Sequence, residues 1–329
     1  MILPYFLRLL CLCFASFFVL NAAAGLLVGI ASKSALRFAD SRTPGAAAGF
    51  LLALRVLPLV IASSFVFGLC VPSYLSLEPA LTSEHVSILC LILGLLGALT
   101  WFLSVVRSTH SLFASMRHNR LCLLASQEMC LSGRSCTLLV VENETPLLAL
   151  SGLLRPRLLV SRGVLRVLSA EELDAALSHE HAHRTSRDNA KRLLLLLAPD
   201  IFPFVRTLHA LERSWSKFAE WAADDQAAAG DSRRAVSLAA ALVRVARLGS
   251  SPRLPHLSTS LLAGDFDLSA RVDRLLQASP ETQATHARPP YPRPLFRGAG
   301  LLFVGGLALL LFTPPALSFV HGLLELLLH

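Results

Sequence analysis

Residues 169–188 read SAEELDAALSHEHAHRTSRD and combine a helix start with three closely spaced histidines. Ser169, followed three residues later by Glu172, forms a capping box, in which the serine caps the helix and the glutamate reaches back. The pattern that follows predicts a helix running to about Leu197, just before Pro199. The histidines therefore lie on a predicted helix.

The order of residues within this helix satisfies the pattern H-E-x-x-H. His179 and His183 are four residues apart, so both can direct an imidazole nitrogen at one zinc ion from the same helix face. Glu180 is rotated by about a quarter turn and flanks the water that a zinc site leaves room for. It can take a proton from that water and deliver it to a leaving amine. His181 points elsewhere, and the alternative reading of the whole cluster is the polar face of a surface helix.

A third metal ligand is expected from the alanine-rich segment 216–230, SKFAEWAADDQAAAG. Glu220 has apolar neighbours, and a buried carboxylate needs a partner because burying an unpaired charge is costly. It could complete a site of two histidines and one glutamate. Asp224, four residues later, could accept the far N–H of a ligand histidine. Glu212 and Asp225 are competing candidates for this ligand, but we expect both to be solvated charges.

The composition indicates a membrane protein, since 54% of the 329 residues are hydrophobic and the mean hydropathy is +0.59. A helix that crosses a bilayer needs about 20 apolar residues. Four stretches meet that length, at about 6–31, 47–71, 86–106 and 298–320. Arg55 interrupts the second. We expect it to extend toward the nearer membrane surface, and the alternative is that it faces the interior of the helix bundle.

The basic residues of the loops predict the orientation. Lys33, Arg37 and Arg42 lie in the first loop, whereas the second loop has no lysine or arginine. The positive-inside rule then places the first loop and residues 107–297 in the cytoplasm and both chain ends outside. A signal peptide cleaved near NAAAG, residues 21–25, is the alternative, but it would leave the basic loop outside.

These features divide the chain into three parts. Residues 1–106 form three transmembrane helices, 107–297 a cytoplasmic domain with a single core, and 298–329 a fourth transmembrane helix with a short tail. Within the domain we expect helices at about 107–131, 169–197, 204–229, 232–248 and 268–277, strands at 137–141, 147–150 and 158–160, and a loop at 249–265.

Two classes of site are disfavoured. None of the seven cysteines forms a CxxC pair, which argues against a thiolate zinc site. The net charge of +8 comes from scattered basic residues without an aromatic-interleaved stripe, so we expect no direct binding of nucleic acid. Attraction to anionic lipid explains this charge more simply.

The stretch from Arg155 to Asn189, followed by Glu220-Trp-Ala-Ala-Asp224, resembles the BlaR1/MecR1-type membrane metallopeptidases, peptidase family M56. It is similar, more distantly, to the HtpX/Ste24-type M48 peptidases. Three spans before the domain and one after it match the first family, and residues 269–276 resemble a basic helix late in its domains. The resemblance implies one Zn²⁺ held by His179, His183 and Glu220, and Glu180 as catalytic base. It also implies an α-helical membrane protein with an inserted α+β zincin-like domain, whose strands near 146–160 would hold an extended peptide.

The sequence departs from this family in two respects. His181 replaces an aliphatic residue, and the chain ends nine residues after the fourth span, so we expect no extracellular antibiotic sensor. Asp188 matches an acidic position for which a structural role is expected. No group that stabilises the transition state is evident. Tyr291 lies in the linker, and a structural role is favoured for the remaining possibilities, which are His209, His256 and Arg271.

The resulting hypothesis is an inner-membrane zinc endopeptidase that takes part in signalling. Its partners are the lipid bilayer and a protein substrate, either a cytoplasmic regulator such as a transcriptional repressor or a membrane protein. One alternative is an HtpX-like quality-control protease, although those have a different layout of spans. The other is a non-proteolytic signalling or scaffold protein with a zinc-stabilised domain, which would not need the base Glu180.

Overall fold

The structure is a computed structural model that describes residues 4–78, 86–130, 137–153, 156–200, 206–249, 257–261 and 268–277, together with 318, 319 and 322. The predicted fourth span, about 298–320, lies almost entirely outside the described residues.

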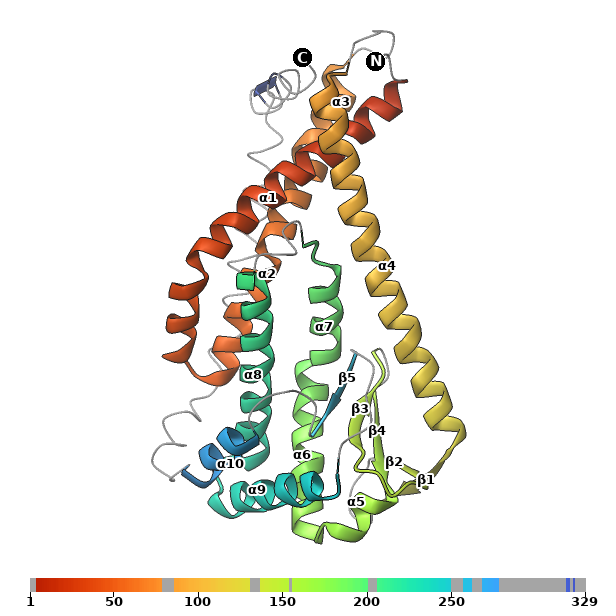
Figure 1. Cartoon of the computed structure of the whole chain (residues 1–329), viewed down its shortest axis with the longest axis vertical. Coiled ribbons are helices and arrows are strands. Elements are labelled where there is room, and N and C mark those ends of the chain that lie inside the picture. Colours follow the sequence, from red (N-terminus) through yellow and green to blue (C-terminus); the bar gives the residue numbers. More distant parts are fainter. Residues whose placement is uncertain are drawn as a thin grey trace.

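Among the described residues, three helical segments are long and apolar enough to cross a membrane, and they coincide with the first three predicted spans. They are α1 (Tyr5–Asp40), the run Pro44–Leu77, and α4 (Ile88–Leu124). The middle run consists of α2 (Pro44–Phe65), a π-helical turn (Val66–Cys70) and α3 (Val71–Leu77). In Figure 1, α4 diverges from α1 and α2, and α7 and α8 lie between α2 and α4. The chain is therefore a multi-pass membrane protein by helix length and composition.

Arg55 is buried by contacts between distant parts of the chain. Its side chain is 2% exposed and forms ion pairs with Asp200 and Glu212. The fold brings two carboxylates from the segment after α7 and from α8 to this buried guanidinium, so its charge is balanced in the interior.

A small mixed sheet follows α4, with strands β1 (Ser126–Cys130), β2 (Thr137–Val141), β3 (Leu148–Ser151), β4 (Arg157–Ser161) and β5 (Ser258–Ser260). Their order is β1-β2-β4-β3-β5, with β2 and β4 parallel and the other neighbours antiparallel. β2, β3 and β4 confirm the predicted strands. The predicted helix at 107–131 ends earlier, at Leu124, because β1 pairs with β2. β5 lies in the predicted loop at 249–265, and its three residues are too few to show a strand period in sequence.

The helices of the domain are α5 (Arg162–Val167), α6 (Ala170–Ser186), α7 (Asp188–Leu197), α8 (Arg206–Ala228), α9 (Ser232–Arg247) and α10 (Leu268–Gln277). Ser169 and Glu172 form the predicted capping box, with hydrogen bonds of 3.2 and 2.9 Å. The predicted helix from 169 to 197 is divided at Arg187, which adopts a left-handed conformation with φ of 55°. This turn ends α6 and starts α7 in a new direction.

Two apolar cores position α6 and α8. Leucines and valines of β2, β3 and β4 pack with α6 and α9, among them Leu150, Leu177 and Leu238. The apolar face of α8 packs instead against α1 and α2, where Leu211 and Phe218 are buried. α8 thus lies between the membrane helices and the helix that carries the histidines (Figure 1).

Candidate metal centre

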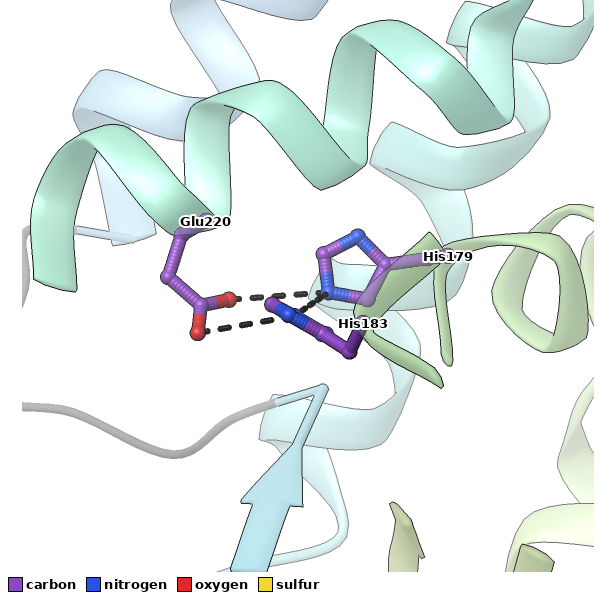
Figure 2. A group of neighbouring side chains, drawn as sticks. All are labelled: His179, His183 and Glu220. Atoms are coloured by element: carbon purple, nitrogen blue, oxygen red, sulfur yellow. Dashed lines mark hydrogen bonds and ion pairs between the residues drawn. The ribbon is translucent and has the colours of Figure 1, made fainter. Parts of the chain in front are cut away.

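The structure brings His179, His183 and Glu220 together, as the sequence predicts. The two histidine Nε2 atoms lie 3.1 Å apart. Glu220 places Oε2 3.5 Å from His179 Nε2 and Oε1 3.6 Å from His183 Nε2. Figure 2 shows the carboxylate facing both imidazoles from the opposite helix. Each residue can offer a ligand atom, and these atoms all lie within 4.8 Å of one another.

Local structure explains this convergence. α6 holds the two histidines one helical turn apart on one face, and both are buried. On α8, Phe218 and Ala219 turn toward the membrane helices, so the adjacent Glu220 faces α6. The exposed fraction of Glu220 is 1%, and burial of this carboxylate is compatible with folding only because cationic or ligand-binding groups surround it.

On each histidine, a carboxylate lies close to Nδ1, the ring nitrogen that does not face the other ligands. Asp224 Oδ1 lies 3.0 Å from His179 Nδ1, and Asp188 Oδ2 lies 2.7 Å from His183 Nδ1. Such contacts fix the tautomer and ring orientation of metal-binding histidines and leave each Nε2 available as a ligand. Asp224 is where the sequence predicts it. The contact of Asp188 with His183 was not predicted, because it depends on the turn at Arg187.

Arg271 of α10 binds Asp224, the carboxylate that lies next to His179. Its guanidinium donates hydrogen bonds of 2.9 and 2.6 Å to the two oxygens of Asp224 and one of 2.9 Å to the Leu261 carbonyl. Its Nη1 also lies 3.3 Å from Glu220 Oε2. The sequence offered Arg271 as a possible stabiliser of the transition state, with a structural role favoured. The resemblance of residues 269–276 to a late helix of the family was the signal that pointed to it.

Glu180 lies beside this cluster on α6 and is fully buried. Among the described residues neither of its carboxylate oxygens has a hydrogen-bond partner, and the oxygens of Glu220 have ion-pair contacts but no hydrogen bonds. Buried polar atoms without partners are rare in folded proteins and call for an explanation. A cation between Glu220 and the two Nε2 atoms, with a water beside Glu180, would satisfy these atoms. The residues therefore fit a metal ion.

The electrostatics agree with a cation site. Burial raises the pKa of Glu180. Burial would lower the pKa of His183, but the carboxylates of Glu220 and Asp188 raise it to about 10. The pKa of His179 is likewise raised by Asp224 and Glu220 against the effect of burial. Despite its burial, Glu220 has a pKa well below its usual range, because His183 and His179 are beside it. Zinc binding at His183 would therefore displace a proton.

The other residues considered from sequence lie apart from the cluster. His181 is exposed on α6. Glu212 pairs with Arg55, and Asp225 accepts hydrogen bonds of 2.6 and 2.7 Å from Arg274. His209 is half exposed and lies 3.7 Å from Glu212. His256 and Tyr291 lie outside the described residues.

A cavity of about 250 Å³ lies beside α7 and α8. Arg192 lines this cavity, and its Nη2 also lies 3.8 Å from Glu220 Oε1 of the cluster. The remaining lining residues are Arg107, Leu195, Leu196, Glu212, Arg213, Trp215 and Ser216.

Comparison with known proteins identifies the family. No curated protein matches the chain. The family model described as BlaR1 peptidase M56 matches residues 83–275, which is more than half of the chain and runs from the start of α4 to α10. The matched region contains the HExxH helix, Glu220 and both outer carboxylates, and the cluster fits the site of an HExxH metallopeptidase. The chain belongs to the BlaR1 peptidase M56 family of metallopeptidases.

Proposed function

We propose that this protein is an integral-membrane zinc endopeptidase whose ligands are His179, His183 and Glu220. The observation that carries the proposal is the buried cluster of these three side chains, with the carboxylate of Glu180 beside it, which has no hydrogen-bond partner in the described part of the chain. Two neutral imidazoles and one carboxylate are a donor set that suits Zn²⁺ and leaves a position open. When bound there, zinc would polarise a peptide carbonyl and make a water molecule more acidic.

The protein's own residues perform the proton transfers. Glu180 accepts a proton from the attacking water on its carboxylate and later donates it to the leaving amine. Burial raises the pKa of Glu180, which makes its carboxylate a stronger base for the first transfer. Asp188 accepts an N–H hydrogen bond from His183 Nδ1, and Asp224 lies 3.0 Å from His179 Nδ1; both contacts orient the rings so that the Nε2 lone pairs are directed at the metal.

The family and the apolar helices imply a lipid bilayer and a protein substrate as partners. We further propose a zincin-like domain at 107–297, between three spans in 1–106 and a fourth in 298–329. The basic first loop supports a cytoplasmic active site with both chain ends outside. The substrate is then a cytoplasmic regulator, such as a transcriptional repressor, or a membrane protein. β5 pairs with β3, so an extended peptide would align along β5 rather than along β3.

Cleavage by the purified full chain tests the proposal. The protein in detergent, loaded with zinc, is incubated with a casein-like substrate and with a co-expressed candidate repressor, and self-cleavage is followed. We expect cleavage by the unaltered protein and its loss in Glu180→Gln. Glu171→Gln is the matched control, because Glu171 is an exposed glutamate of the same helix. Equal cleavage by Glu180→Gln, or no cleavage by any zinc-loaded form, would contradict the proposal.

A reporter fused after His329 tests the orientation separately. We expect a periplasmic signal, and a cytoplasmic signal would reverse the proposed topology.

A further inference from the structure

Arg55 is the single charged residue of α2, yet its side chain is buried. Its Nε donates a hydrogen bond of 2.8 Å to Glu212 Oε1, and its Nη2 donates one to Asp200 Oδ1. A buried guanidinium without such partners would be strongly unfavourable. The packing of α2 at this point therefore depends on two acidic residues that lie outside the membrane helices.

Arg107 of α4 also binds Asp200, one of the two partners of Arg55. Its Nη1 donates to Asp200 Oδ2 at 3.1 Å, and its Nη2 donates to the carbonyls of Leu196 and Ala198 at 2.8 and 3.3 Å. Carbonyls at the C-terminal end of a helix have no hydrogen-bond partner within the helix, so Arg107 supplies donors to the carbonyls at the end of α7. We call the four charged residues Arg55, Arg107, Asp200 and Glu212 the ionic clamp. It has no net charge and joins α2 and α4 to the end of α7 and to α8 (Figure 1).

α8 connects the ionic clamp with the metal centre. Glu212 precedes Glu220 by eight residues on this uninterrupted helix, which corresponds to about 12 Å along its axis. Between them, Trp215, Phe218 and Ala219 are buried in the cluster that includes Ala47 and Leu51 of α2. One side of α8 is thus held by the membrane helix, and the other side presents Glu220 to the histidines.

We infer that Arg55 is a positioning residue of the metal centre, acting through Glu212, Asp200 and α8 on the placement of Glu220. The inference rests on the proposed role of Glu220 as a metal ligand. A metal site requires its ligands within a few tenths of an ångström of the productive geometry. A shift of α2 relative to α6 changes the distance between Glu220 and the imidazoles, so the membrane helices set the metal affinity and the coordination geometry.

Metal binding to the full chain in detergent tests the inference. We compare Arg55→Gln with Arg42→Gln, an exposed arginine at the end of the first loop whose guanidinium lies over the Phe38 ring. The readouts are the zinc dissociation constant, by competition with a chelator, and the visible absorption spectrum of the Co²⁺-loaded protein. We expect Arg55→Gln to weaken zinc binding by about tenfold or more and to change the cobalt spectrum, as for other supporting residues of metal sites. Arg42→Gln should leave both unchanged, and Arg55→Lys should restore part of the affinity.

The spectrum separates positioning from general destabilisation, since the geometry of bound cobalt reports the ligands directly. Where Arg55→Gln yields no folded protein, Glu212→Gln takes its place, because it removes the charge of a partly exposed partner and keeps its shape. An unchanged zinc constant together with an unchanged cobalt spectrum in the folded variant would overturn the inference and leave the proposed function standing. Absence of zinc binding by the unaltered protein would overturn both.

Discussion

Arg271 donates two hydrogen bonds to Asp224, one of 2.9 Å from Nε to Oδ2 and one of 2.6 Å from Nη2 to Oδ1. Asp224 in turn lies 3.0 Å from His179 Nδ1, so a chain of contacts runs from α10 to a proposed metal ligand. The cationic neighbour also holds the pKa of Asp224 at about 2 despite its burial, which keeps this carboxylate ionised. A fork-shaped guanidinium suits this two-oxygen contact, and an ammonium does not.

Arg271→Lys should therefore weaken zinc binding by about 10- to 100-fold, the usual cost of losing a residue that orients a ligand. The measurement is the zinc dissociation constant by chelator competition. Arg274→Lys is the control, because Arg274 contacts both oxygens of the neighbouring Asp225, through Nη2 alone, away from the metal centre. Equal constants for the Arg271 variant and the unaltered protein would exclude a role for this contact.

Asp188 should also support zinc binding, because it orients the second proposed ligand histidine, His183. Asp188→Asn removes the charge that faces His183 Nδ1 at 2.7 Å, and we expect zinc affinity to fall by about 10-fold or more. Asp174→Asn removes a half-exposed carboxylate that pairs with Arg234 on the domain surface, and it should have no effect on zinc. The prediction fails if the two variants release zinc at the same chelator concentration.

Zinc binding should depend on pH in a defined direction. Carboxylates raise the pKa of His183 to about 10 and also raise that of His179, so at pH 7 the metal-free cluster holds protons. Zinc binds neutral imidazole, and these protons must leave when it binds. The affinity should rise from pH 6 to pH 8, by about tenfold per pH unit for each proton displaced. Calorimetry in buffers of different ionisation enthalpy would count the protons, and an affinity that does not change with pH would contradict the prediction.

The capping box supports the histidine helix itself. Ser169→Ala removes the hydrogen bond of 3.2 Å to the Glu172 backbone N–H, and we expect a loss of about 1 kcal/mol in stability. Thermal unfolding of the detergent-solubilised protein measures this loss of stability, and Ser186→Ala at the other end of α6 serves as the comparison. Equal melting temperatures would show that the cap does not limit the stability of the domain.

Local patterns were sufficient for much of the site. The ligand pair His179 and His183 depends only on helix periodicity, and the capping box places the start of that helix. Glu220 was found because a carboxylate among alanine and aromatic residues is unusual. The family resemblance, confirmed over residues 83–275, joined these separate segments into one site.

The contacts missed from sequence depend on distant parts of the chain. Arg271 meets Asp224 across 47 residues, and Arg55 meets Glu212 across 157. No periodicity encodes such pairs, since they follow from how helices pack. The break at Arg187 was missed for another reason. A left-handed conformation is uncommon for arginine, and the residue carries no signal of the kind that glycine would give.

The central claim is that His179, His183 and Glu220 form a zinc site at which Glu180 acts without binding the metal. Zinc content per chain, measured in parallel on the purified unaltered protein, Glu180→Gln and Glu220→Ala, tests it most directly. The account predicts about one zinc ion per chain in the first two and a large loss in the third. Full zinc content in Glu220→Ala, or its loss in Glu180→Gln, would contradict it.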